Sequence, residues 1–391
     1  MTTTPLAIGL DQALAFRLHR QHLLEPAADG LAAAGSLIGA QAQVHSAALL
    51  QLRARAAAGV DDAALERALY ADRSLVKLWA HRSTLHLFPA TDLPMVLGVR
   101  GLHSDAYQKW YSREGLPPEQ VAVLIGAISQ ALADGPHSRM DLSRRLVPQL
   151  GDWAKPWLEH SWGGVLKLAC ALGHLCHGPA MGAESEGEAG LREARFVRLE
   201  SWLPPGTPIT PMAGRAAVAA LLRRYLASFG PASPADFRKF SGLPAGPVHQ
   251  GFADLAGKIT PVAIAGKPGF FILVDDGEAL HQAEHVPGHL TTLPLFDPWL
   301  LGHQDTGQYL DDRHRPAIYR TAGWISPVVL RQGRVVAHWS HRRIGAAGGR
   351  NKPRWQVTLT PLEKLYKKEL PAITRALRRL SGGLAVDLVN P

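Results

Sequence analysis

The sequence predicts an α+β protein in which groups of short helices, each followed by a strand pair, recur about three times before a β-rich C-terminal region. Apolar residues recur at helical spacing between Gly and Pro breaks over roughly the first 300 residues. Three groups of these expected helices are each followed by short stretches of β-favouring residues. We therefore expect about three tandem winged-helix domains and a C-terminal β-barrel or β-rich domain.

The first group is expected to contain four helices and one wing. Asp11 and Asp61 are placed to cap two of the helices. The stretch "LVKLWAHRSTLHLF" alternates in polarity, so it predicts a strand pair over residues 75–88. The expected helices cover residues 11–24, 27–38, 46–58 and 61–71.

The second and third groups repeat this order. Ser138 and Ser233 each follow a Pro-containing break and stand at the N-cap position of an expected helix. The second group has expected helices at 118–132, 138–150 and 162–175 and short strands within 177–199, on either side of a Gly- and Glu-rich tip at 182–190. The third has expected helices at 215–229, 233–241 and 245–255 and strands at 259–264 and 270–274.

The C-terminal region is predicted to form several strands followed by a basic helix over residues 361–380. Gln332-Gly333 predicts a tight hairpin turn. Strands are expected at 291–296, 318–320, 325–330, 334–340 and 355–359. The predicted domains are winged helices at 1–115, 116–210 and 211–288 and a β-rich domain at 289–391.

The positive charge is concentrated near the end of the chain. The formal net charge is +9, and residues 313–379 hold 16 Lys and Arg against only Glu363 and Glu369, a net charge of +14. Clustered positive charge favours a polyanionic partner and a face that follows phosphates. No apolar run is long enough for a membrane span, and residues 1–10 are too weakly apolar for a signal peptide.

The only two cysteines, Cys170 and Cys176, exclude a disulfide framework and fit a reducing cytosol. They stand with His174 and His177 in "CALGHLCHG", but no second ligand pair has zinc spacing, so we expect helix packing and no metal. The sequence contains no Walker loop, GxGxxG, HExxH or GxSxG motif, and we expect no cofactor.

Five stretches, in this order, resemble one family. They are "IGAQAQVHSAALLQLRAR" (38–55), "LVKLWAHRSTLHLFPATDL" (75–93), "RRYLASFGPASPADFRKFSGL" (223–243), "LPLFDPWLLGHQDTGQYLD" (293–311) and "PVVLRQGRVVAHW" (327–339). Together they are similar to the winged-helix DNA glycosylases typified by AlkZ and YcaQ, over roughly residues 10 to 380.

The resemblance implies a concave, positively lined scaffold that hydrolyses the N-glycosidic bond of alkylated purines. AlkZ-like members excise bulky adducts or unhook crosslinks left by natural products, often in self-protection. The resemblance places the active site at Gln41 and Gln43. YcaQ-type members carry Asp at the second position, so Gln43 matches the AlkZ subgroup and favours labile, cationic lesions.

The chemistry of two amides fits this role. On an extended segment, residues two apart lie on one face, and Gly39 together with a helix start near Ser46 permits such a segment. An amide is no general base at pH 7, but it holds and orients a water molecule. That suffices for a cationic purine, which departs without much acid help. The alternative is that both are ordinary polar residues at a helix start.

Other candidates would contact DNA. Arg82, Thr84 and His86 alternate along the first wing, which predicts a shared strand face. Two basic elements are candidates for a DNA-inserting hairpin, and the sequence does not choose between them. The first comprises Arg313, His314 and Arg315, and the second contains His341, Arg342, Arg343, Arg350 and Lys352. Asp297 and Asp305 could act as catalytic carboxylates or in turn and cap chemistry, and for Asp297 we prefer the turn and cap role.

We expect a monomeric bacterial enzyme that acts on double-stranded DNA in the cytoplasm, at the nucleoid. No lysine stands out as a Schiff-base nucleophile, so a monofunctional glycosylase is predicted. Two alternatives stay open at this point. One is a non-catalytic winged-helix DNA-binding protein such as a regulator, and the other is a resistance protein that sequesters a toxin.

Overall fold

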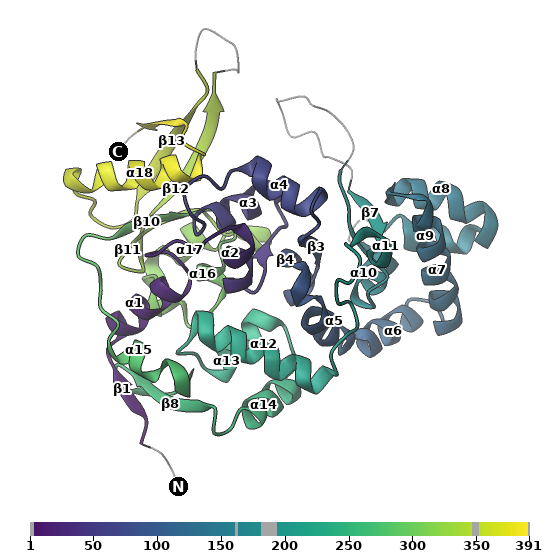
Figure 1. The fold of residues 1–391 in the computed structure, drawn as a ribbon, viewed down its shortest axis with the longest axis horizontal. Helices are drawn as coiled ribbons and strands as arrows, with labels where there is room; N and C mark the ends of the chain where they lie inside the picture. Colours follow the sequence, from purple (N-terminus) through teal and green to yellow (C-terminus); the bar gives the residue numbers. More distant parts are fainter. Residues whose placement is uncertain (1–3, 161–162, 181–193, 346–351, 390–391) are drawn as a thin grey trace. The chain divides into compact units, whose positions relative to one another are not determined.

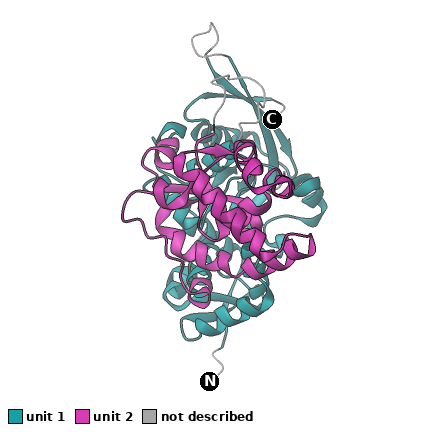
Figure 2. Cartoon of the chain, turned by 90° about the vertical axis from the view of Figure 1, so that its right-hand side faces the viewer, with its two compact units in different colours: residues 1–65, 219–391 teal, residues 66–218 magenta. Residues whose placement is uncertain are grey.

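The computed structural model describes residues 4–160, 163–180, 194–345 and 352–389. The chain forms two compact units, of which unit 1 comprises Met1–Leu65 with Ala219–Pro391, and unit 2 comprises Glu66–Val218. Unit 2 is therefore a single insertion in the sequence of unit 1, as the colours of Figure 2 show. Within the described residues, no helix is both long enough and apolar enough to cross a membrane.

The four expected N-terminal helices are confirmed, with shifted ends. The Asp29 carboxylate caps the second of them by accepting a hydrogen bond from the Ala32 amide. They are α1 (Leu10–Arg20), α2 (Gly30–Ser36), α3 (His45–Arg53) and α4 (Asp62–Tyr70), the last of which crosses the boundary between the units.

A small sheet in unit 1 joins the start of the chain to its middle. Strand β1 (Leu6–Ile8) pairs in parallel with β8 (Ile259–Ile264), which pairs antiparallel with β9 (Lys267–Leu273). Ser233 caps α13 in a capping box with Asp236, as its position predicted. The neighbouring helices are α12 (Gly214–Phe229), α13 (Pro234–Ser241), α14 (Ala245–Asp254) and α15 (Gly277–His281).

The C-terminal region contains a five-stranded sheet with α18 (Leu370–Leu380) packed on it (Figure 1). Gln332 and Gly333 both have positive φ, 50° and 83°, which confirms the tight hairpin turn. Buried Ile373 and Leu377 of α18 cluster with Val357 of the sheet. The strand order is β10 (Leu290–Leu293), β11 (Val328–Arg331), β12 (Arg334–Ile344), β13 (Arg354–Pro361) and β14 (Ala385–Val389), and only the β13–β14 pair is parallel.

Three expectations for this region are wrong. The sheet is open, with β10 and β14 as its edges, so it is no barrel. The strand expected at 318–320 is replaced by a short helix, α17 (Arg315–Ile318), because Pro316 favours a first helical turn. The closing helix begins at Leu370 rather than at 361, because β13 continues to Pro361.

The two sequence segments of unit 1 share a hydrophobic core. Leu14 and Leu18 of α1 cluster with Leu293, Trp299 and Leu330 from the C-terminal region. A buried side chain of this size contributes about 1.5–3 kcal/mol through removal from water, so this core holds residues far apart in sequence together. The four-part division expected from the sequence, with its three winged helices, stays a prediction.

Unit 2 contains both strands and helices. Strands β3 (Leu75–Trp79) and β4 (Leu85–Pro89) pair antiparallel, which confirms the first expected strand pair. Ser138 caps α8 in a capping box with Asp141, as predicted. The other strands are β5 (His137–Ser138), β6 (Leu175–His177) and β7 (Arg195–Arg198), and the helices are α5 (Leu93–Gly101), α6 (Ser104–Arg113), α7 (Pro118–Ala131), α8 (Arg139–Leu150), α9 (Lys155–Leu158), α10 (Gly164–Ala171) and α11 (Leu199–Trp202).

Candidate active site

Gln41 lies in a short extended segment between two helices of unit 1. Strand β2 (Ala40–Gln41) follows α2, and α3 begins only at His45, so the expected non-helical stretch is confirmed. Ile38 and Gly39 have φ values of 53° and 97°, which turn the chain sharply out of α2. A β-branched residue such as Ile38 rarely adopts a positive φ. We infer that contacts with the surrounding protein hold the segment in this conformation.

The two candidate glutamines differ in exposure. Gln41 is buried, with 6% of its surface exposed, whereas Gln43 is exposed. A neutral amide tolerates such burial when it is hydrogen-bonded, while a carboxylate at Gln41 would need a cationic partner. One amide is therefore held inside the protein and the other is open to solvent.

Gln51 of α3 fixes the backbone of the Gln41 segment. Its amide Nε2 donates to the Gln41 carbonyl at 3.0 Å and to the Leu295 carbonyl at 3.1 Å, and the side chain is fully buried. Its Oε1 is buried without a hydrogen-bond partner in the described chain, which costs about 1–3 kcal/mol. Gln51 therefore links the candidate catalytic segment to the C-terminal region at some cost in stability.

A buried ion pair stands next to Gln51. Both terminal nitrogens of Arg55 donate to the two carboxylate oxygens of Asp297 at 2.8 Å, and neither side chain has any exposed surface. Arg55 also donates to the Gln51 carbonyl, and Asp297 accepts from the Trp299 amide. The expected cap role of Asp297 is confirmed. Asp305 also caps a short helical turn, since it accepts from the Gly307 amide.

Sequence reasoning missed Gln51 and Arg55. Both stand in the stretch 38–55 that carried the family resemblance, and their spacing of four residues places them on one side of a helical turn. A polar side chain among the apolar positions of α3, and a second one just after the end of that helix, were the available signal. Their partners, the Leu295 carbonyl and Asp297, lie some 240 residues away in the chain and give no local pattern.

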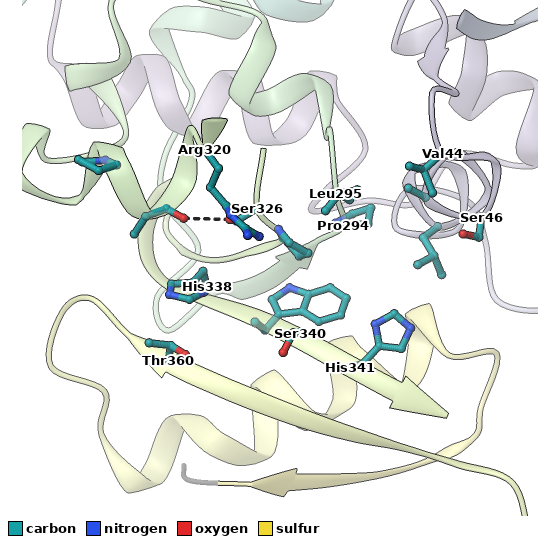
Figure 3. A pocket seen from close by; sticks show the side chains of 16 residues that line it. Val44, Ser46, Pro294, Leu295, Arg320, Ser326, His338, Ser340, His341 and Thr360 are labelled. Carbon is teal, nitrogen blue, oxygen red and sulfur yellow. Dashed lines mark hydrogen bonds between the residues drawn. The ribbon is translucent and has the colours of Figure 1, made fainter. Parts of the chain in front are cut away.

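A cavity of about 620 Å³ opens beside this segment, entirely within unit 1. Its wall includes Val44, the residue after Gln43, together with Leu295 and the N-terminal half of α3. Figure 3 shows Val44 and Ser46 on one side and His338, Ser340 and His341 along β12 on the other.

Both basic elements border the same cavity. Pro316 and Ala317, directly after Arg315, line one part of its wall, and His341, directly before Arg342, lines another. Of the predicted site residues, His341 itself lines the cavity, while Gln43 and Arg315 each directly precede a lining residue in the sequence. Partial burial, with nearby Arg320, lowers the pKa of His338, so its imidazole favours the neutral form at pH 7.

The charges of the first basic element are partly engaged within the protein. Arg313 and His314 both contact the Glu363 carboxylate, which holds the pKa of that carboxyl below its usual value. Arg315 donates to the Thr306 hydroxyl, and its guanidinium lies 4.6 Å from the centre of the Tyr319 ring.

The second element lies on the strands that extend from the sheet. His341, Arg342 and Arg343 are exposed residues of β12, and the His341 ring stacks on Trp355 with 3.9 Å between ring centres. Lys352 is exposed, and Arg350 lies outside the described residues.

The shared strand face expected for Arg82, Thr84 and His86 of unit 2 is wrong. Arg82 and Ser83 have φ values of 52° and 58°, so the chain makes a tight turn there and only His86 lies in a strand. His86 is 2% exposed, and burial, with nearby His81 and Arg82, lowers its pKa well below the usual value. A neutral, covered imidazole has no free edge for DNA in this conformation.

The cysteines of unit 2 pack in the core. Cys170 and Cys176 are buried, and burial raises the pKa of Cys170 to about 11. A thiol with such a pKa is a poor metal ligand at pH 7. Within the described ranges, no group of three or more His, Cys, Asp or Glu residues is arranged to hold a metal ion.

Comparisons with known proteins agree with this arrangement. A family model described as "DNA glycosylase AlkZ-like" matches residues 34–382, which include the glutamine segment and the cavity. The chain is 33% identical over 337 residues to the Interstrand DNA cross-link repair glycosylase of Streptomyces sahachiroi, covering 84% of this chain and 86% of that protein. The solved structure of the DNA glycosylase AlkZ from the same organism matches with a TM-score of 0.82 at 30% identity, covering 98% of this chain and 100% of that one.

The fold and these matches define the class of protein, a DNA glycosylase, which hydrolyses N-glycosidic bonds. Within this class, the chain belongs to the AlkZ-like family, as its sequence resemblance predicted.

We expect Asp297→Ala to lower the free energy of unfolding by about 3–5 kcal/mol, because it leaves the Arg55 charge buried without a partner. The double variant Arg55→Met with Asp297→Leu should recover most of that loss, since it removes both charges. Urea denaturation measures both. Arg334→Ala, which breaks the exposed pair with Asp11, serves as control and should cost less than about 1 kcal/mol. A loss for Asp297→Ala no larger than that of the control would contradict this account.

Proposed function

We propose that this chain hydrolyses the N-glycosidic bond of bulky or crosslinked N7-alkylated purines in double-stranded DNA, without lyase activity. The observation that carries the proposal is the non-helical Gln41–Gln43 segment, which is followed directly by Val44 in the wall of a cavity that His341 also lines. A relative that shares a third of its residues with this chain is named as an interstrand DNA cross-link repair glycosylase, which supports the crosslink as a substrate.

The two amides define what the site does. Their oxygens and nitrogens hold one water molecule near C1′ of the modified nucleotide, but they do not deprotonate it in advance. The C1′–N9 bond breaks first, and its electron pair returns to the cationic purine, which leaves neutral. The water oxygen then bonds to the oxocarbenium-like sugar, and its proton passes to solvent. The products are the free modified base and an abasic site.

The geometry favours an open encounter with the lesion. A bulky adduct or crosslink does not fit a tight base pocket, so we expect the modified base to be met in the groove without full extrusion. The basic elements would grip phosphates on either side. We propose that the protein works as a monomer in the bacterial cytoplasm, at the nucleoid, in repair that protects a producer of genotoxic compounds.

We predict that Gln41→Ala with Gln43→Ala slows release of 7-methylguanine or a bulky N7 adduct from duplex DNA by at least about 100-fold, because the water loses its position. Base release is measured by chromatography of the free base and by strand scission at the abasic site. Gln282→Ala, at the exposed glutamine that directly follows α15, is the matched control and should act as wild type. Equal rates for the double variant and the control would remove both glutamines from catalysis.

We also predict that Arg342→Ala with Arg343→Ala weakens binding to unmodified duplex equally for all sequences. The slope of log affinity against log salt should fall by about 2, because two phosphate contacts are lost. Arg313→Ala with Arg315→Ala provides the comparison for the other basic element, and Arg144→Ala with Arg145→Ala is a control on α8. If only the variant at Arg313 and Arg315 changes the salt slope, Arg342 and Arg343 do not contact phosphates.

A further inference from the structure

The cavity beside the glutamine segment is larger than a simple alkyl lesion requires. Its volume of about 620 Å³ compares with about 150 Å³ for a cavity that binds benzene and about 30 Å³ for one water molecule. It falls within the range of about 300–1,000 Å³ that is typical of sites for drug-sized molecules. A methylated base would leave most of this space unused.

The cavity wall is fixed to the candidate catalytic backbone. Leu295 lines the cavity, and its carbonyl oxygen accepts from the same Gln51 nitrogen that donates to the Gln41 carbonyl. Since both oxygens lie within 3.1 Å of that nitrogen, at most about 6 Å separate them. One residue of the cavity wall, Leu295, is therefore anchored close to the backbone of Gln41, although the two glutamines are not themselves among the lining residues.

The residue types in the cavity wall indicate which chemical groups the cavity can bind. Of the sixteen lining residues described, eight are aliphatic or proline, three carry aromatic rings, four carry hydroxyls and one is Arg320. None of the sixteen is a carboxylate. Such a wall favours an uncharged, largely apolar group with a few hydrogen-bond acceptors, and disfavours a second cationic centre.

The largest lining side chain is held rigidly. The Trp339 indole N–H donates to the Leu293 and Val328 carbonyls at 3.2 and 3.1 Å, so its ring cannot turn to seek another partner. The Ser326 hydroxyl likewise donates to the Ala317 carbonyl at 2.9 Å, the bond dashed in Figure 3. A preformed wall lowers the entropic cost of binding.

We propose that this cavity binds the non-nucleotide part of a DNA adduct, an uncharged and mainly apolar group of drug size attached at purine N7. This inference rests on the proposed function, since it places the reacting base at Gln41 and Gln43. It assigns the selectivity for bulky lesions to the wall formed by α3, α17 and β12. Binding of the attached group would hold the damaged base at the glutamines without a pocket for the base itself.

The test uses variants in which a tryptophan side chain fills part of the cavity. Ala317→Trp is compared with Ala279→Trp, a matched change at an exposed alanine of α15 away from the cavity. The probes are duplexes with 7-methylguanine and with guanine that carries a biphenylmethyl group at N7. Ser340→Trp, at an exposed lining residue of β12, is the second filling variant in case Ala317→Trp does not fold. Melting temperature and affinity for unmodified duplex confirm that each variant is intact.

We expect either filling variant to slow release of the biphenylmethyl adduct at least about tenfold, while release of 7-methylguanine changes less than about twofold. If wild type acts only on the bulky probe, the filling variants should instead lose at least about tenfold of the preference in Kd for that duplex over unmodified duplex.

Equal effects of a filling variant on both probes, or an adduct rate like that of Ala279→Trp, would overturn the inference while the glycosylase activity stands. If wild type releases neither base, the proposed function fails first and the inference falls with it.

Discussion

The fully buried pair of Arg55 and Asp297 is the constraint on which the candidate site depends. Two charges without exposed surface are stable only as partners, because removal of one from water costs several kcal/mol. Once they are paired, Gln51 is placed to reach both the Gln41 and Leu295 carbonyls. The start of the chain is thus tied to a segment that follows it by 242 positions, and the cavity forms where the two meet.

This constraint also explains how much the sequence could predict. Features that depend on neighbouring residues were predicted correctly. Ser138 and Ser233 cap helices through capping boxes, β8 has its expected ends, and Gln332-Gly333 forms the tight hairpin turn. Each of these depends on residues within a few positions. Gln51 was missed because its partners are distant in the chain, and the turn at Arg82 was missed because neither Arg82 nor Ser83 is a usual residue for positive φ.

The open sheet has a similar cause. Alternation along each strand predicted β-structure, but the side on which a strand pairs depends on remote contacts. Strand β14 pairs in parallel with β13 after α18 has crossed the sheet, which leaves β10 and β14 as separate edges. Likewise β1 finds its partner in β8, about 250 residues later, so the first residues of the chain belong to a sheet that no local pattern indicates.

At Gln41, an amide in place of a carboxylate is consistent with the surroundings of the segment, whereas Gln43 is exposed and is under no such constraint. Gln41 is covered, and a carboxylate there would need a cation of its own, as Asp297 needs Arg55. An amide avoids that requirement but gives up the negative charge that would best stabilise a cationic sugar. The site must then rely on a leaving group that is already cationic and on accurate placement of the damaged nucleotide. In the arrangement that we propose, a wall that binds a large group attached to the base supplies that placement. The two amides and the neighbouring cavity are then complementary parts of one site.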